Sequence, residues 1–462
     1  MVRLPRWGSN GMSLISRLTT IAAAGNGLDL DYYWFDVYGD ASGNSITDVK
    51  VDSQGNSVEY YYNTDFYGAF LTKREPNGTV LWQKKILQYY YGNQAPESTK
   101  IAFDENDDII LALRVDQNGN SPAMTLHSGT DGSLSDGPVF INAQSGSGGI
   151  DGTPRFAEKL SNGNYLSACY TQVHTLNSTL DGIVSVGRGN TNSTVIGKDS
   201  SGNIVLYRNS AGGTISGQFY FWLTGFNPIT GSKAYERRIQ HTGLNFGIQK
   251  YLSNGTDTYL VGYQQVSGSY VALVCKLSAE GSSASISWAR YFTGVSYVDA
   301  EILSTGEVIV LGHSTSFTAS SGYSSVNIIN MSSSGSVNYW DSFGPASGNS
   351  QRVQPSGGMG KDQNDNLYIP CYKAGVSNKV GMLKIPGSTG AVTQTLSTAD
   401  TGLSGNLRYY HSYTNSPFNQ YGGASSNTSV NSISNKSAST GNYGSINVSS
   451  SSYTHTQADI TI

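Results

Sequence analysis

Cysteine is scarce in this chain of 462 residues, which contains only three. Cys169, Cys275 and Cys371 lie far apart inside apolar runs, and no Cys-x-x-Cys pair occurs. That spacing supports neither a zinc site nor a redox motif. We therefore expect three buried free thiols that pack as small hydrophobic side chains.

Charge is also sparse, because charged residues make up 13% of the sequence and the net charge is −4. No long basic or acidic run occurs, so neither nucleic acid nor an anionic membrane surface is an expected partner. No stretch reaches the ~18 apolar residues that a membrane-spanning helix needs, and no membrane span is predicted. Arg17 interrupts the apolar part of the N-terminus, which argues against a cleaved export signal.

Catalytic motifs are missing as well. The sequence has no His-Glu-x-x-His, no Gly-x-Ser-x-Gly and no glycine-rich phosphate loop, and its six histidines are widely spread. We predict that the chain is not an enzyme and uses no cofactor. A Ser-His-Asp triad or a glycosidase pair of carboxylates that assembles only in space stays open as an alternative.

Glycine and tyrosine, by contrast, are abundant, with 55 and 31 residues respectively. Many glycines and asparagines suit tight turns, while aromatic and β-branched residues favour strands. The aromatic share of 11% argues against a disordered chain. The composition therefore predicts an all-β protein with many turns.

A short phrase of the form Asp-x-x-Gly/Asp-Asn recurs between apolar runs, as in the segments 50–62, 198–207 and 361–370. Its copies follow one another at intervals of about 40–60 residues, the period of a β-propeller blade. We interpret each copy as a hairpin turn between two strands. The turn residues are Asp52, Gly55, Asn56, Asp104, Asp107, Gly163, Asp199, Gly202, Gly255, Gly306, Asp362 and Asp365.

A second glycine turn follows most copies about 25 residues later. Each repeat then contains four short strands, and one such unit cannot bury both of its faces, so the units must stack side by side and close into a ring. Residues 31–397 are predicted to form a seven-bladed β-propeller. Blades three and four depart most from the pattern, so the number of blades there stays open.

Tryptophans mark particular strands of these repeats. Trp82, Trp288 and Trp340 lie at the start of the last strand of their repeats, and Trp222 is predicted to be core between repeats. Trp34 has a similar neighbourhood but precedes the first repeat. We predict that residues 31–39 pair with the seventh repeat, which would fasten the ring, or lie beside it; a simple lead-in strand is the alternative.

The repeat "VDSQGN…AFLTKREPNGTVLWQKK" resembles propeller repeats written D-x-x-G-N … K-x-x-x-x-G-x-x-x-W. Such repeats are similar to those of bacterial surface proteins and of virion proteins of tailed phages, especially marine ones. The resemblance covers roughly residues 31–397 and implies the fold. It implies little about activity, since propellers carry many unrelated functions.

Three acidic segments resemble calcium-binding loops. The segments 104–108, 116–120 and 362–366 place oxygen ligands two residues apart, as calcium loops do. None has the downstream glutamate of the full motif. Asp and Asn also occupy hairpin turns because they favour turn conformations, and we favour this interpretation. No metal site is therefore predicted.

The two ends differ from the repeats. Residues 1–30 place apolar side chains at helical spacing and are predicted to be an N-terminal docking segment, with a short helix packed on the ring as the alternative. Residues 398–462 are dominated by Ser, Thr and Asn but contain strand-like alternation. They are predicted to be an assembly segment that adds strands to other sheets, with a self-packed extension of the propeller as the alternative.

Tyrosine-rich loops are the candidate surface-binding residues, because such side chains offer stacking faces and adaptable hydrogen bonds. They are Tyr89, Tyr90, Tyr91, Tyr409, Tyr410, Tyr413 and Tyr421. The function expected is a structural component of a tailed-phage virion, in the tail or an appendage, present as a homo-oligomer. Its partners would be other virion proteins through 1–30 and 398–462, with a host-surface glycan or protein as a further possibility. A secreted or cell-surface bacterial binding protein is the alternative.

Overall fold

The computed structural model is almost wholly β-strand, with one short 3-10 turn at Gly281–Ser283 and no α-helix among the residues it describes. The expectation of an all-β chain is confirmed. The described residues are 32–35, 45–63, 68–76, 80–88, 99–115, 121–142, 153–169, 172–180, 183–188, 193–209, 219–241, 245–292, 294–314, 325–343, 352–374, 379–390, 406–408, 414–415, 439–440 and 446–450.

Most sheets are meanders of four consecutive antiparallel strands. The first is β2 (Ser45–Val51), β3 (Ser57–Asn63), β4 (Gly68–Arg74) and β5 (Val80–Gln88). The second is β6 (Thr99–Phe103), β7 (Ile109–Val115), β8 (Ser121–His127) and β9 (Leu134–Asn142). The third is β10 (Pro154–Lys159), β11 (Tyr165–Cys169), β12 (Gln172–Leu176) and β13 (Ile183–Arg188).

Two further meanders share one nine-stranded sheet. One is β14 (Ser193–Lys198), β15 (Ile204–Asn209), β16 (Phe219–Asn227) and β17 (Ser232–His241). The other is β18 (Phe246–Ser253), β19 (Thr258–Val266), β20 (Ser269–Leu277) and β21 (Ile286–Phe292). Among the described residues, a single strand pairing makes them one sheet, the parallel pairing of Gly197 in β14 with Tyr251 in β18.

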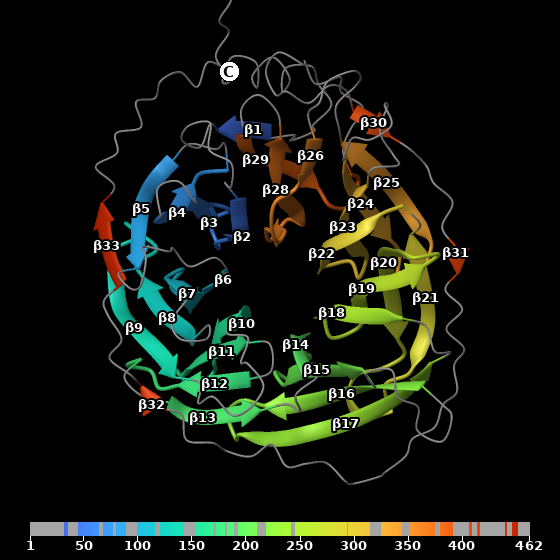
Figure 1. Ribbon diagram of the computed structural model, residues 1–462, viewed down its shortest axis with the longest axis horizontal. Helices are drawn as coiled ribbons and strands as arrows, with labels where there is room; N and C mark the ends of the chain where they lie inside the picture. Colours follow the sequence, from blue (N-terminus) through green and yellow to red (C-terminus); the bar gives the residue numbers. More distant parts are fainter. Residues whose placement is uncertain are drawn as a thin grey trace, which may run out of the picture.

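The remaining strands complete two more sheets. One is the meander β22 (Ser296–Ile302), β23 (Val308–Ser314), β24 (Ser325–Met331) and β25 (Val337–Phe343). The other contains β26 (Arg352–Pro355), β27 (Gly360–Lys361), β28 (Asn366–Ala374), β29 (Lys379–Pro386) and β1 (Tyr32–Phe35). Figure 1 shows all these sheets set around a central opening, with first strands such as β2 and β22 nearest to it and last strands such as β5 and β25 on the circumference.

The N-terminal strand β1 joins the last sheet of the chain. It pairs antiparallel with β29, and Trp34 lies opposite Gly381. The prediction that residues 31–39 pair with the last repeat is therefore confirmed for Tyr32–Phe35. The pairing brings the two ends of the 31–397 region together, as Figure 1 also shows.

Four short strands of the segment 398–462 lie on the outside of the ring (Figure 1). They are β30 (Asn406–Arg408), β31 (Thr414–Asn415), β32 (Ser439–Thr440) and β33 (Ile446–Ser450). In that order they pair antiparallel with β25, β21, β9 and β5 of the same chain. The segment thus adds a fifth strand to outer sheet edges, as in the self-packed alternative.

Apolar clusters fill the spaces between neighbouring sheets. In one cluster Phe292 and Trp340 meet edge to face, with ring centroids 5.7 Å apart. From the sequence we expected Trp340 to be equivalent to Trp82 and Trp288. In the structure the equivalent residue is Tyr339. Trp82 and Trp288 donate to a backbone carbonyl of the following sheet, and the Tyr339 hydroxyl does the same. Trp340 is fully buried on the other face of β25, since side chains alternate along a strand.

Trp222 is half-buried and lies outside the buried clusters, so the prediction that it forms core is wrong. The guanidinium carbon of Arg208 lies 4.3 Å from the centre of its ring. Arg208 and Trp222 are directly opposite each other on β15 and β16, which places the cation over the aromatic face.

Candidate functional site

The repeated turns join the first two strands of successive sheets. In the first of them, the Asp52 and Asn56 backbones close a hairpin, and Gly55 has φ +86°. The Asp52 carboxylate accepts hydrogen bonds from the backbone N–H groups of Gln54 and Asn56 at 2.9 and 2.8 Å. The motif thus encodes an Asx turn followed by a residue in the left-handed region, as its residue types require.

The other predicted turn residues, Gly255 excepted, occupy equivalent places. Asp104, Asp199 and Asp362 each accept two backbone N–H groups within their own turns. The residues with positive φ in these turns are Gly163, Gly202, Gly255, Gly306, Asp107 and Asp365. Six of the turns therefore share one geometry, with Asp in place of Gly twice. The turn Asn254–Asp257 is one residue shorter and has Gly255 at its second position.

The two left-handed aspartates connect neighbouring sheets. Asp107 accepts hydrogen bonds from the backbone and hydroxyl of Ser53 in the preceding turn. Asp365 accepts from the Ser304 backbone at 3.0 Å and hydroxyl at 2.5 Å, and Lys361 lies 2.6 Å away. Burial opposes ionisation of Asp365, but these donors outweigh it and hold the pKa of its carboxyl below the usual value. Asp107 and Asp365 thus adopt the left-handed conformation of the turn and also link neighbouring sheets by hydrogen bonds.

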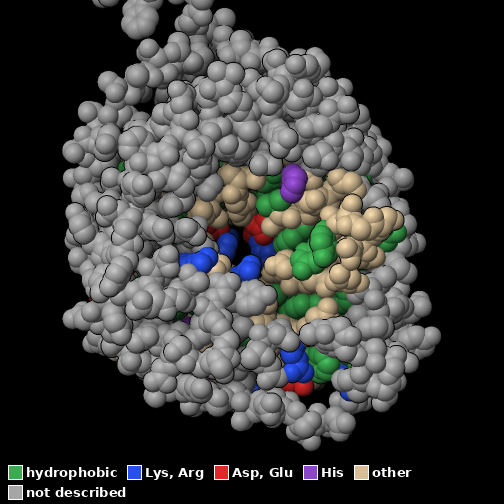
Figure 2. Space-filling view, in the orientation of Figure 1, with side chains coloured by type: hydrophobic (Ala, Val, Ile, Leu, Met, Phe, Trp, Pro, Cys, Tyr) green, Lys and Arg blue, Asp and Glu red, His purple; other side chains and the backbone are tan. Residues whose placement is uncertain are grey.

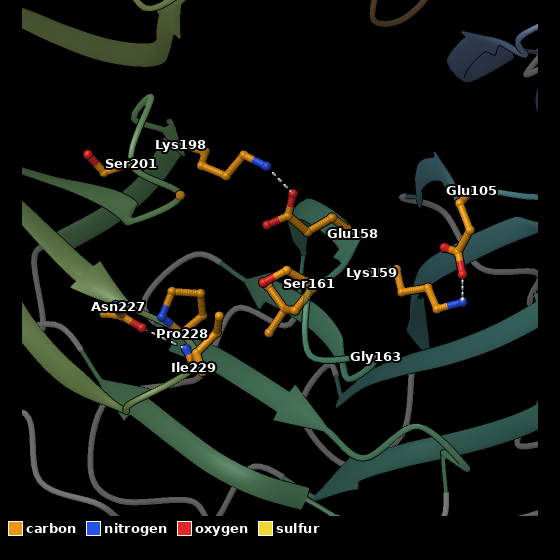
Figure 3. A pocket seen from close by; sticks show the side chains of 12 residues that line it. Glu105, Glu158, Lys159, Ser161, Gly163, Lys198, Ser201, Asn227, Pro228 and Ile229 are labelled. Carbon is orange, nitrogen blue, oxygen red and sulfur yellow. Dashed lines mark hydrogen bonds and ion pairs between the residues drawn. The ribbon is translucent and has the colours of Figure 1, made fainter.

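A polar pocket of about 530 Å³ opens among three of these turns and one turn between the last two strands of a sheet (Figure 3). It lies where the β6–β7, β10–β11, β14–β15 and β16–β17 connections meet. Lys198 pairs with Glu158, and Lys159 pairs with Glu105 at 2.7 Å. Other lining residues are Ser161, Ser201, Asn227, Pro228 and Ile229. Its size suits a small ligand, and its lining supplies both charges and hydroxyls.

One carboxylate of this pocket has a perturbed pKa. The hydrogen bond from Lys159 lowers the pKa of Glu105, which makes it a poor proton donor at neutral pH. Glu158 has its own ammonium partner in Lys198. The arrangement suits binding of a polar ligand better than general-acid catalysis.

A second charged site surrounds the central opening, where Figure 2 shows basic (blue) and acidic (red) side chains lining a hollow. Its members share one position, four residues before the first residue of a repeated turn. Asp48 and Lys100 pair at 3.2 Å, and Lys250 and Asp299 pair at 2.9 Å. Gly358 holds the same position in the last sheet. A Cβ built on it would lie 2.9 Å from an Asp48 oxygen and 3.3 Å from an Asp299 oxygen, so the missing side chain makes room for both carboxylates.

The ion pairs of this site shift the pKa values of Asp299 and Lys250. Burial opposes the charge on Asp299, but Lys250 and Lys100 outweigh it and lower the pKa of the carboxyl. In the same way Asp299 and Glu301 outweigh burial and raise the pKa of Lys250. Because each pair joins the innermost strands of adjacent sheets, the charges connect the sheets across the inner edge of the ring.

Nucleophilic and metal-binding side chains do not gather in the described part of the chain. The three cysteines are free and buried, as predicted, and burial raises the pKa of Cys371 to about 12. No group of three His, Cys, Asp or Glu residues that could hold a metal ion occurs among the described residues. The Asp104 and Asp362 carboxylates instead accept N–H groups of their own turns.

Several predicted sites lie outside the described residues. These are the tyrosines 89, 90, 91, 409, 410, 413 and 421, the segment 116–120 and the docking segment 1–30. Sequence reasoning missed the central charges and the pocket. Three of the central charges had a detectable signal, because Asp48, Lys100 and Asp299 each lie seven residues before the left-handed residue of their turn. Lys250 lies five residues before Gly255 and departs from that spacing. The pocket had none, because its residues come from three separate repeats.

Comparison with known proteins identifies no family. No protein-family model matches the chain, and no curated protein matches it. Among solved structures it is similar to a protein of unknown function from Bacteroides caccae, with 12% identity, a TM-score of 0.34, and coverage of 55% of this chain and 84% of the other. It is also similar to the extracellular domain of a putative one-component system from B. thetaiotaomicron, with 10% identity and a TM-score of 0.39. That match covers 76% of this chain and 40% of the other.

At TM-scores below 0.5 neither likeness bears on the fold or the function of this chain. Within the described residues, no helix has the length and hydropathy needed to cross a membrane.

Proposed function

We propose that the chain is a seven-bladed β-propeller that serves as a structural component of a tailed-phage virion, in the tail or an appendage. The nine-stranded sheet supports the blade count, because a single parallel pairing joins its two halves. Divided there, the sheets make seven units, six of which share the same turn geometry. The proposed mechanism is display of loops on a rigid ring that is present in several copies.

The observation that carries the proposal is the closure of the ring by direct contacts between its first and last sheets. The Gln363 side chain donates to the Ser53 carbonyl at 3.2 Å, and the Tyr368 hydroxyl donates to the Gly55 carbonyl at 3.3 Å. A ring closed in this way has no free face between blades, so it resists opening and keeps its loops in fixed relative positions. Such rigidity suits a load-bearing or display element.

Detection of the protein in purified particles tests the virion role. Particles banded twice on a density gradient and washed in high salt should contain the chain at constant stoichiometry, measured by quantitative mass spectrometry against the major capsid protein. Labelled antibodies should mark one site on the particle in electron micrographs. Recovery only from the envelope or medium of uninfected cells would overturn the proposal.

The polar pocket favours a second candidate, a secreted or cell-surface binding protein. Lysines and carboxylates of three repeats converge there around a volume suited to a small polar molecule. This candidate predicts that uninfected cells carry or secrete the protein. It also predicts that K159M and K198M weaken ligand retention on a glycan or metabolite array without changing the melting temperature.

A further inference from the structure

At the outer edges of the sheets, the chain's own C-terminal strands form backbone pairings that the same strands of a second copy could also form. The last strand of each sheet presents a row of backbone N–H and C=O groups, which readily pair with another strand. Four of these edges, β25, β21, β9 and β5, are covered by strands of the segment 398–462. The segment visits them in the order opposite to that in which the sheets follow one another in the chain.

The covered edges differ from an uncovered one in charge. Among the described residues no strand is added to β17, which carries Lys233, Glu236, Arg237 and Arg238. Charged side chains along an edge discourage strand addition. Of the covered edges, β21, β25 and β9 each carry a single charged residue, Arg290, Asp341 and Asp136 respectively, and β5 carries Lys84 and Lys85. β13 carries only Arg188 and has no added strand among the described residues, so charge alone does not decide which edges are covered. The C-terminal strands thus lie on edges that would otherwise be open to another chain.

The pairing depends on backbone groups and register. β33 and β5 are matched over five residues, with Asn447 opposite Leu87 and Val448 opposite Ile86. The other three pairings cover two or three residues each. Any chain with the same strand sequence could make these bonds, so a neighbouring copy competes directly with the chain's own tail.

The connection between β29 and β30, residues 387–405, is long enough to permit such a change of partner. A segment of roughly 19 residues reaches about 60 Å when extended. Five strands spaced about 4.8 Å apart span about 19 Å, so the tail could reach beyond its own sheet to an adjoining ring. Exchange of an identical element between copies is a low-cost route to oligomers.

We propose that the segment 398–462 is exchanged between copies, so that one chain's β33 completes the β5 edge of the next. This inference rests on the proposed role in a multi-copy assembly. In a dilute monomer the tether gives the chain's own tail an effective concentration in the millimolar range, so the cis arrangement dominates. When rings are held side by side, the neighbouring tail becomes an equal competitor.

Disulfide trapping tests the exchange in the full-length chain. Leu87 and Asn447 are cross-strand partners, at a separation that suits a disulfide. One batch carries only L87C and a second only N447C; they are unfolded, mixed, refolded together at high concentration and oxidised. We expect a disulfide-linked species of twice the chain mass that contains one copy of each variant.

Two controls make the result decisive. Q83C lies four residues from Leu87, roughly 13 Å along the strand, and should not link to N447C. The double variant L87C/N447C should link within one chain when refolded dilute. Linkage only within the double variant at every concentration overturns exchange, and no linkage even there overturns the pairing itself. Either failure leaves the particle experiment unaffected, so the two proposals fail separately.

Discussion

At the scale of single residues, positive φ angles decide which side chains the turns can accept. Gly132 has φ +71° and Gly163 has φ +84°, but their surroundings differ. A Cβ on Gly163 would have no heavy atom within 4 Å, whereas one on Gly132 would lie 2.6 Å from two ring atoms of Trp82. Gly132 therefore serves two purposes, since it permits the turn and also admits a tryptophan from the preceding sheet.

Alanine substitution separates these two effects. G163A should destabilise the protein by about 1 kcal/mol, the cost of the left-handed conformation. G132A should cost about 2–4 kcal/mol because Trp82 must also move. Urea denaturation monitored by tryptophan fluorescence measures both. Equal losses for the two variants would show that Trp82 does not pack on Gly132.

His127 should make stability depend on pH. Burial lowers its pKa to about 4, below the usual 6.5, and its Nε2 lies 3.0 Å from the Thr125 hydroxyl. Above pH 6.5 the ring is neutral in both states, and its contribution to stability is fully present. As pH falls from 6.5 to 4 only the unfolded state gains a proton, so stability declines by up to about 1.4 kcal/mol per pH unit.

The variant H127Q isolates this contribution. Its unfolding free energy should fall less steeply than that of the parent between pH 6.5 and 4.5, as measured by urea titration at each pH. Parallel curves for the two proteins would contradict the role of His127. His174 is buried with its pKa also lowered to about 4, so a slope from that residue should persist in the variant.

At the scale of elements, strand pairing between distant parts of the sequence holds the sheets together. β1 adds the strand that completes the edge of β29, and four backbone positions are matched between them. The sequence pointed to this pairing because Trp34 resembles the last-strand tryptophans yet stands before the first repeat. Closure by a strand from the opposite end of the repeats makes unfolding of the last sheet depend on both ends.

Deletion of residues 1–39 removes this strand. We expect the unfolding free energy to fall by about 2–4 kcal/mol, since each lost backbone hydrogen bond contributes about 1 kcal/mol. Deletion of residues 1–30 is the matched control, because it retains β1. Calorimetry of both proteins and the parent measures the change. A loss of the same size in the control would assign the stability to the preceding segment instead.

At the scale of the whole molecule, charges around the central opening connect different sheets. Lys250 of β18 contacts Asp299 and Glu301 of β22 at 2.9 and 3.0 Å, and Lys50 of β2 lies 3.8 Å from Glu301. These side chains are largely shielded but not sealed from solvent. Their attraction is therefore stronger than that of a surface pair and weaker than that of a fully buried one.

A double-mutant cycle measures this attraction. K250M and D299N should be coupled by about 1–2 kcal/mol in urea denaturation, and 1 M salt should reduce the coupling. The exposed pair Lys159–Glu105 provides the comparison and should give a smaller coupling. Coupling at the centre no larger than at this surface pair would mean that the central charges do not help to hold the ring together.

The sequence by itself determined the all-β class, the turns and the buried state of the cysteines. It did so because these depend on local chemistry: left-handed φ needs Gly, Asp or Asn, and an Asx turn needs a carboxylate two residues before an N–H group. It also placed β1 on the last sheet through a displaced tryptophan. It misjudged Trp222 and the alignment of Trp340, because a shift of one residue moves a side chain to the opposite face of a strand.

Only the tertiary structure decided which residues meet. The pocket joins Glu105, Lys159 and Lys198 from three repeats, and Gly358 becomes informative only beside Asp48 and Asp299. The polar tail could not be assigned from composition, since its strands pair through backbone groups that every sequence possesses. Contacts of this kind depend on the distance between elements in the folded chain, and no local pattern of residues records that distance.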